Sequence, residues 1–140
     1  MELGNLRETA DCHRATEALS RVGDKWSVLI FMQLEIKAHR FGELRRQISG
    51  ISPKMLAATL RGLERDGFVL RTVFPTKPPS VEYALTDLGR EMAAPVRAVG
   101  TWVLDNIHRI EGAREKFDAD ASGADQLGAG PIGREVATSR

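Results

Sequence analysis

The chain has 140 residues, of which 42% are hydrophobic and 28% charged, a composition typical of a single globular domain. Its one cysteine excludes an internal disulfide framework and any zinc site built from several cysteines. No apolar run approaches the roughly 18 residues that a membrane span requires, and the N-terminal stretch has neither a cationic start nor an apolar segment. We therefore expect a cytoplasmic protein that does not associate with a membrane.

The net charge of +1 conceals an uneven distribution along the chain. From Lys37 to Lys77 there are nine basic residues and three acidic ones, a balance of +6, whereas the segments before and after have balances of −2 and −3. A basic region between acidic flanks is typical of a surface that contacts phosphates. A solvated helix face with a chance charge bias explains the charge alone equally well.

Apolar residues at helical spacing predict two helices near the N-terminus. Ala15, Leu19 and Val22 mark the first, which ends at Gly23, and all three are expected in the core. A denser apolar helix follows, for which we expect Trp26, Leu29, Ile30 and Leu34 in the core; it covers Lys25–Ile36.

A short strand and a short third helix are predicted next. Arg40 and Phe41 can begin the strand, and Phe41, Leu44 and Ile48 are spaced three and four residues apart, as in a helix. This helix stops near Gly50, where a tight connection begins.

A fourth helix is predicted from Pro53 to Asp66. Ser52 suits its N-cap because a hydroxyl can satisfy an orphan amide, and a proline in first position has no amide to satisfy. Gly67 supplies the left-handed residue that ends the helix. Two helices joined by so short a turn form a helix-turn-helix.

The fourth helix has an inner and an outer face. Leu56, Leu60 and Leu63, assisted by Met55, form an apolar stripe that should pack on the domain. A helix that enters the DNA major groove, about 12 Å wide, suits basic side chains at its edges and small ones where its backbone comes close. The outer face has this composition, with Lys54, Ala57, Ala58, Arg61 and Arg65.

After Gly67 the apolar pattern becomes that of β-strands. Residues 68–74 and 80–85 are rich in β-branched and aromatic residues and are separated by the segment Pro75-Thr76-Lys77-Pro78-Pro79. They predict a hairpin with a stiff, lysine-bearing tip. A helix-turn-helix followed at once by a hairpin is a winged helix, which is more specific than either part alone.

A C-terminal helix carries a long apolar seam. Thr86 can cap its start, and Pro95 should kink the helix or split it into two segments. We expect the seam to contact a second copy of the chain, joined by Leu3 and Leu6, although packing on the chain's own winged helix would also explain it. The predicted dimer interface consists of Leu88, Met92, Val96, Val99, Trp102, Val103, Ile107 and Ile110.

The predicted fold is therefore mainly α with a small β hairpin (α+β), a winged helix-turn-helix with additional N- and C-terminal dimerisation helices. Residues 1–118 are expected to form this DNA-binding domain, with dimerisation helices over 87–118. Residues 119–140 are rich in glycine, alanine and serine and lack a periodic apolar face, so we expect a flexible tail.

Five blocks of the sequence match one known family in order: Gly23–Trp26, Arg40–Arg46, Gly50–Leu56, Leu60–Gly67 and Val81–Gly89. Together they resemble the successive signatures of HxlR-type transcriptional regulators, a MarR-like winged-helix group. The resemblance implies a homodimeric bacterial repressor or activator that binds inverted repeats, with the fourth helix in the major groove and the hairpin as wing.

Two departures from the family's pattern bear on base specificity. Bulkier polar residues are usual where this chain has Ala57, Ala58 and Thr59, and an arginine is frequent where it has Ser80. Base specificity is therefore expected to depend on fewer side chains.

Charge and resemblance together predict contacts to double-stranded DNA. The alternative is a winged-helix protein-interaction module whose basic face docks an acidic protein without sequence-specific DNA binding. The predicted DNA-binding residues are Lys25, Arg40, Arg45, Arg46, Ser52, Pro53, Lys54, Ala58, Arg61, Arg65, Arg71 and Lys77.

Residues that could serve catalysis lack any motif spacing. Cys12 and His13 are adjacent and point apart on a helix, and His39 and His108 are isolated in the sequence. A glycine-rich phosphate loop, a metal motif and a nucleophile elbow are all missing from the sequence. We therefore expect no enzyme, no cofactor and no metal.

Two inputs are candidates for releasing DNA. Cys12 lies near the start of the first helix, where backbone amides and Arg14 favour the thiolate, and several members of the resembled family are thiol sensors; an inert, small hydrophobic cysteine is the alternative. The other input is a small ligand in a pocket lined by Trp26, Phe31 and Trp102, which as ordinary core residues would need no ligand.

Overall fold

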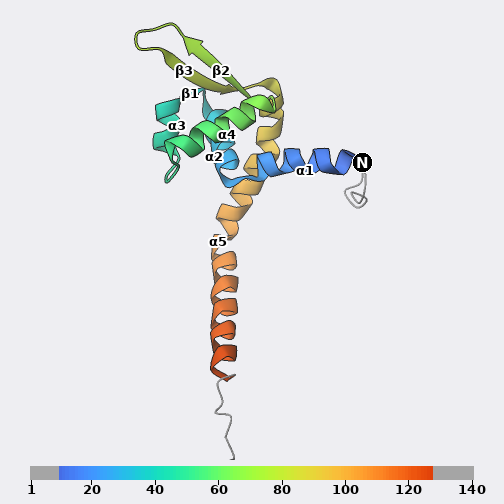
Figure 1. Ribbon diagram of the computed structural model, residues 1–140. Helices are drawn as coiled ribbons and strands as arrows, with labels where there is room; N and C mark the ends of the chain where they lie inside the picture. The colour runs from blue at the N-terminus through green and yellow to red at the C-terminus, as the bar shows by residue number, and fades with distance from the viewer. Residues whose placement is uncertain (1–9, 128–140) are drawn as a thin grey trace, which may run out of the picture. The chain divides into compact units, whose positions relative to one another are not determined.

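The computed structural model describes residues 10–127, which belong to two compact units divided between Thr101 and Trp102. Within this range no helix has an apolar stretch of the length that a membrane crossing needs. The elements, labelled in Figure 1, are α1 (Ala10–Gly23), α2 (Lys25–Ile36), β1 (His39–Arg40), α3 (Phe41–Gln47), α4 (Pro53–Arg65), β2 (Val69–Phe74), β3 (Ser80–Leu85) and α5 (Asp87–Leu127).

The three strands form one antiparallel sheet in the order β1-β3-β2. Tyr83, in the central strand, lies opposite His39 of β1 and Arg71 of β2. The strands β2 and β3 form the predicted hairpin, which projects beyond the helices of the first unit (Figure 1). The mainly helical winged fold with a small sheet is thereby confirmed.

The core of the first unit forms where α2, α4 and the sheet meet. Leu56, Leu60 and Leu63 of α4 are 0–1% exposed, as the inner stripe of that helix predicts. Phe31 of α2 is 1% exposed and makes an edge-to-face contact with Phe68, with ring centroids 5.6 Å apart. Edge-to-face pairing adds to the gain from burying both rings.

Several expected core residues are exposed instead. Met55 is 46% exposed and Leu29 is 40% exposed, because each lies at the margin of its helix's inner face rather than on it. In α1 only the C-terminal end reaches the core: Val22 is buried, whereas Ala15 is exposed and Leu19 is 68% exposed. The prediction that Ala15, Leu19, Leu29 and Met55 are core residues is therefore wrong.

The helix α5 is continuous through Pro95, which lies inside it on its exposed side, so of the two predicted outcomes the split into two segments does not occur. The missing amide of a proline costs one backbone hydrogen bond, which a long helix can lose without ending. The helix also continues past Ala119 to Leu127, so the predicted tail begins too early; Leu3, Leu6 and residues 128–140 lie outside the described residues.

The end of α4 and the start of α5 are joined by short polar contacts. Gly67 has φ +83°, the left-handed conformation predicted for a helix stop. The Thr86 hydroxyl donates to the Gly67 carbonyl (2.5 Å) and accepts from the Gly89 amide (3.0 Å), which confirms Thr86 as the cap of α5. The Thr86 amide donates to the Phe68 carbonyl (3.0 Å). A Cβ atom at Gly89 would collide with that same Phe68 oxygen, so α5 approaches this backbone as closely as a glycine allows.

We predict that Gly89→Ala lowers the free energy of unfolding by about 1–3 kcal/mol, the usual cost of overpacking, since either α5 or the Phe68 carbonyl must move. Urea denaturation followed by circular dichroism measures this. Gly42→Ala is the matched control, because a Cβ there would meet only Arg46 Nη1 at 3.8 Å, and its stability should be equal or slightly higher. Equal stability of both variants would contradict the close approach at Gly89.

Candidate nucleic-acid interface

The turn between α3 and α4 fixes where α4 begins. Gly50 has φ +83°, a left-handed conformation that favours glycine, and the following Ile51 is buried, which anchors the turn in the core. The Ser52 hydroxyl accepts a hydrogen bond from the Met55 amide (3.1 Å), and Pro53 occupies the first turn. The predicted cap is confirmed, and it sets which residues of α4 face outward.

The basic face of α4 consists of Lys54, Ala57, Ala58, Arg61 and Arg65, and all five residues are exposed. They line a surface groove of about 470 Å³ together with Arg21 and Gly62. Within residues 10–127, Lys54 and Arg61 have no acidic partner, whereas Arg65 lies 3.8 Å from Glu17 in an exposed pair that contributes little to stability. Cations without protein partners are available to bind phosphate.

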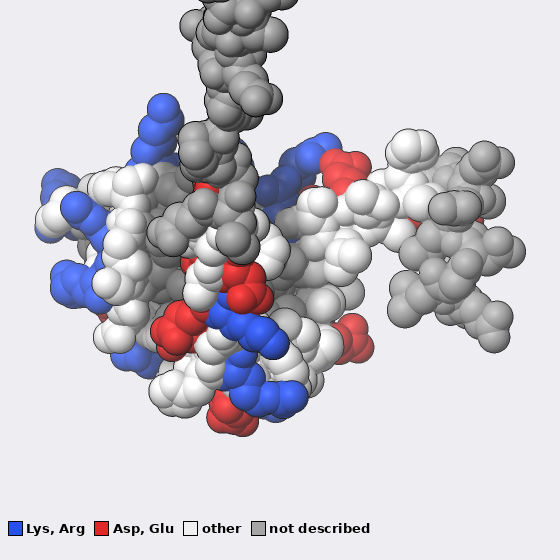
Figure 2. Space-filling view, turned by 90° about the horizontal axis from the view of Figure 1, so that it is seen from below, with Lys and Arg blue, Asp and Glu red and all other residues white. Residues whose placement is uncertain are grey.

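Further exposed basic side chains lie on the elements before and after α4. Arg45 and Arg46 are exposed in the last turn of α3, and Arg71 is exposed on β2. Lys25, at the start of α2, lies over the Trp26 ring with its amine 4.4 Å from the ring centre. Figure 2 views the molecule from below: basic side chains gather along its left edge, the side on which Figure 1 places α3, while the centre mixes both charges.

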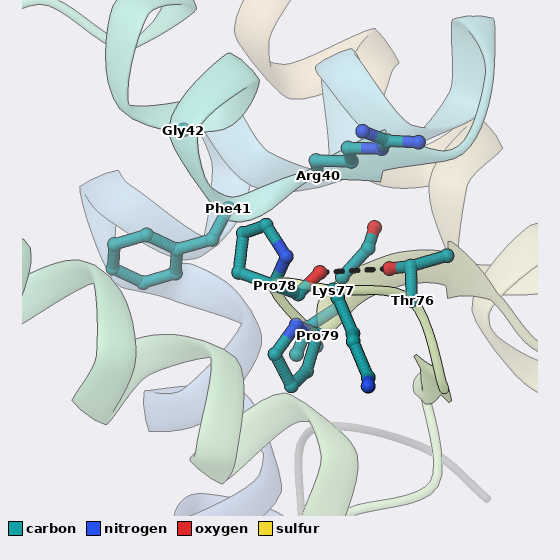
Figure 3. A pocket seen from close by; sticks show the side chains of 9 residues that line it. Arg40, Phe41, Gly42, Thr76, Lys77, Pro78 and Pro79 are labelled. Carbon is teal, nitrogen blue, oxygen red and sulfur yellow. Dashed lines mark hydrogen bonds between the residues drawn. The ribbon is translucent and has the colours of Figure 1, made fainter.

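A second groove, of about 550 Å³, separates the start of α3 from the wing (Figure 3). The Thr76 hydroxyl donates to the Pro78 carbonyl (2.8 Å) and braces the proline-rich tip. Figure 3 shows the Arg40 guanidinium and the Lys77 amine directed away from each other. Two cations so arranged can bind two separate phosphates more readily than share one.

All twelve residues predicted to bind DNA are exposed. The structure brings Lys54, Ala58, Arg61 and Arg65 into one groove, and Arg40 and Lys77 into another. Their contact with DNA stays a prediction. One residue that lines the α4 groove was missed by the sequence reasoning. Arg21 is hydrogen-bonded to Asp66, which is 45 positions away in the sequence, and no local pattern of residues indicates such a contact.

The apolar seam of α5 is divided between two roles. In the first unit Val96 is 4% exposed and Met92 packs against the core, so these two predicted interface residues belong to their own domain's core, together with the buried Ala93. Leu88 (49%) and Val99 (61%) of that unit remain exposed.

The second unit presents more apolar surface. Trp102 is 57% exposed and Val103 is 40% exposed, while Ile107 and Ile110 are half-buried. Leu104 and Phe117 are also largely exposed. Exposed large apolar side chains in this number are typical of a surface that binds another protein.

The residues considered for catalysis are scattered. His39 is buried in the sheet and donates from Nδ1 to the Lys37 carbonyl (2.7 Å), Cys12 is half-buried in the first turn of α1, and His108 is exposed in the second unit. The described part of the chain contains no group of three His, Cys, Asp or Glu residues that could hold a metal ion.

The predicted ligand pocket is wrong for Phe31, which is a core residue packed on Phe68. Trp26 is partly buried against the same core. Trp102 belongs to the second unit and is exposed there.

A capped second helix with an exposed cationic face, followed by a two-stranded wing, defines a winged helix-turn-helix protein. Residues 21–111 match the family model described as HxlR-like helix-turn-helix. The chain belongs to this family.

Relatives in two further comparisons are transcriptional regulators. The Escherichia coli K12 protein YtfH, described as an uncharacterized HTH-type transcriptional regulator, is 43% identical over 100 residues, which cover 71% of this chain and 79% of that protein. The structure of the transcriptional regulator ytfH from Salmonella typhimurium has a TM-score of 0.69 at 42% identity and covers 72% of this chain and 90% of that one. The reduced form of the redox regulator HypR has a TM-score of 0.65 at 35% identity and covers 71% of this chain and 98% of that one.

Proposed function

We propose that this protein regulates transcription by binding an inverted-repeat DNA operator as a homodimer. The observation that carries the proposal is the basic face of α4, where Lys54 and Arg61 are exposed and lack an acidic partner within residues 10–127. A helix held in this way by its cap and its inner leucines can insert into a major groove as a rigid element.

The shape of the α4 face favours DNA over an acidic protein. Ala57 and Ala58 lie between the cations and leave the helix backbone open to close approach by base edges. A protein-interaction site would be expected to carry aromatic anchors at its centre, and none of the described residues that line this groove is aromatic. The cations of the wing and of α3 add phosphate contacts on either side.

Selection from a random pool of DNA duplexes tests the proposal. We expect enrichment of a palindromic sequence with half-sites about one helical turn apart or a small multiple of it. Enrichment of no sequence, with retention of acidic proteins instead, would support the interaction module.

Single alanine variants separate base contacts from phosphate contacts. Arg61→Ala should cost about 1–3 kcal/mol of operator binding and relax specificity. Lys77→Ala should weaken binding to all duplexes alike and lower the slope of log K against log salt by about one unit. Arg40→Ala should act like Lys77→Ala, and the double variant should lower this slope by about two units, because the two side chains point apart.

The measurement is fluorescence anisotropy of labelled duplexes over a range of salt concentrations. Arg114→Ala is the matched control, since it removes the same charge from an exposed site outside the basic region. Parental binding by Arg61→Ala and Lys77→Ala would contradict the assignment of this face to DNA.

The homodimer rests on the uncovered apolar residues of α5. An isolated helix in water is only marginally stable, so a helix that leaves Trp102 and Val103 exposed gains from a partner. A second copy of the same seam is self-complementary across a two-fold axis, the commonest symmetry of soluble oligomers. The proposed interface also includes Leu88, Val99, Ile107 and Ile110. Val96 is not part of it, because its side chain is buried in the core of its own domain.

We predict that Val103→Asp converts the dimer to a monomer and weakens operator binding at least tenfold, since a buried unpaired charge costs several kcal/mol. Sedimentation velocity measures the mass. His108→Asp is the control, because His108 is exposed and lies on the side of the helix opposite Val103 and Ile110, and that variant should stay dimeric. Monomeric wild-type protein would refute the dimer.

Thiol oxidation is the input we propose for releasing DNA. Cys12 is half-buried in the first turn of α1, and the HypR relative is described as a redox regulator. With one thiol in each chain, oxidation would proceed through a disulfide between subunits, a mixed disulfide or a sulfenic acid. A small-molecule effector is the competing input.

Treatment with a thiol oxidant should weaken operator binding by the wild type at least tenfold, and a thiol reductant should restore it. Cys12→Ser should bind the operator like the reduced wild type and should not respond to the oxidant. Mobility-shift titration with and without oxidant measures both. An equal loss of binding in Cys12→Ser would show that the cysteine is inert.

A further inference from the structure

Arg21, near the end of α1, reaches the C-terminal half of α4. Its Nε donates to Asp66 Oδ2 (3.1 Å), in a pair whose side chains are 33% and 26% exposed. A Cβ atom on Gly62 would overlap the Nη1 and Cζ atoms of Arg21. The guanidinium therefore rests on the backbone of α4 at a position where that helix has no side chain, and any larger residue than glycine there would displace it.

The same guanidinium lines the groove of the α4 basic face. Arg21 shares this groove with Lys54, Ala58, Arg61 and Arg65. A guanidinium has five N–H donors, and within residues 10–127 the bond from Nε to Asp66 is the one hydrogen bond that Arg21 makes through its side chain. Both terminal nitrogens, which carry the paired donors that match a phosphate, are left for a ligand.

We propose that Arg21 binds a phosphodiester of the DNA backbone beside the major groove that α4 enters. Asp66 holds the guanidinium in position, and Gly62 provides the space. The inference rests on the proposed function and adds to it a contact from α1, a helix that none of the predicted groove contacts comes from. An arginine that is already held loses less conformational freedom on binding than a free one.

The competing explanation is that the Arg21–Asp66 pair only stabilises the packing of α1 on α4. The salt dependence of DNA binding distinguishes this explanation from a phosphate contact. Loss of a phosphate contact lowers the slope of log K against log salt by about 0.9, whereas loss of a structural tie lowers stability and leaves the slope unchanged.

The experiment compares Arg21→Gln, Arg21→Lys and Gly62→Ala with the wild type in full-length protein, using the selected operator and an unrelated duplex. We expect Arg21→Gln and Gly62→Ala to lower the slope by about one unit on both duplexes, and Arg21→Lys to restore most of it. Gly62→Ala removes no charge, so its effect on the slope reports displacement of the guanidinium alone. Arg14→Gln is the control, since Arg14 lies on the same helix, pairs with Asp11 and does not line the groove.

Thermal unfolding of each variant verifies that it is folded. If Arg21→Gln does not fold, Gly62→Ala and Arg21→Lys still test the proposal. An unchanged slope in the folded variants, with salt-dependent binding by the wild type, would overturn this inference and leave the proposed function intact. Wild-type protein that binds no duplex in a salt-dependent way would overturn the proposed function as well.

Discussion

The close approach of α5 to the backbone at Phe68 is the contact on which the arrangement of α4 and the wing depends. Three elements meet there: Gly67 follows the end of α4, β2 begins two residues later at Val69, and α5 begins at Asp87 after its cap Thr86. Because Gly89 has no side chain, the Thr86 amide and hydroxyl can bond directly to the Phe68 and Gly67 carbonyls. The wing and α4 therefore leave one junction in fixed directions, as the proposed insertion of both into DNA grooves would require.

The inner and outer sides of α4 are stabilised by different forces. Leu56, Leu60 and Leu63 are buried against the core, a non-directional interaction that supplies most of the stability. Among residues 10–127, the ion pairs on the outer side are the exposed pair of Arg65 with Glu17 and the half-buried pair of Arg21 with Asp66. Because an exposed pair is weak, Arg65 can exchange the Glu17 carboxylate for a phosphate at little cost.

Features governed by local chemistry were predictable from the sequence. Ser52 and Gly67 were identified as the cap and the stop of α4 because their roles depend on neighbouring backbone atoms, and the hairpin followed from a change of period. Burial at the margins of helices was not predictable, since Met55 and Leu29 are exposed for reasons set by packing far along the chain. The pair of Arg21 and Asp66 escaped prediction for the same reason, as did the division of the α5 seam.

That division gives α5 two functions in sequence. Ala93 is 2% and Val96 4% exposed, so these positions belong to the domain core and are not available to a partner. Leu88 before them and Val99 after them are exposed, and exposed apolar residues continue with Trp102 and Val103 of the second unit. Since the buried residues hold the start of α5 to the junction that also stops α4, the first unit keeps α4 and the start of α5 in a fixed relation, whether or not a partner binds the exposed apolar residues further along the helix.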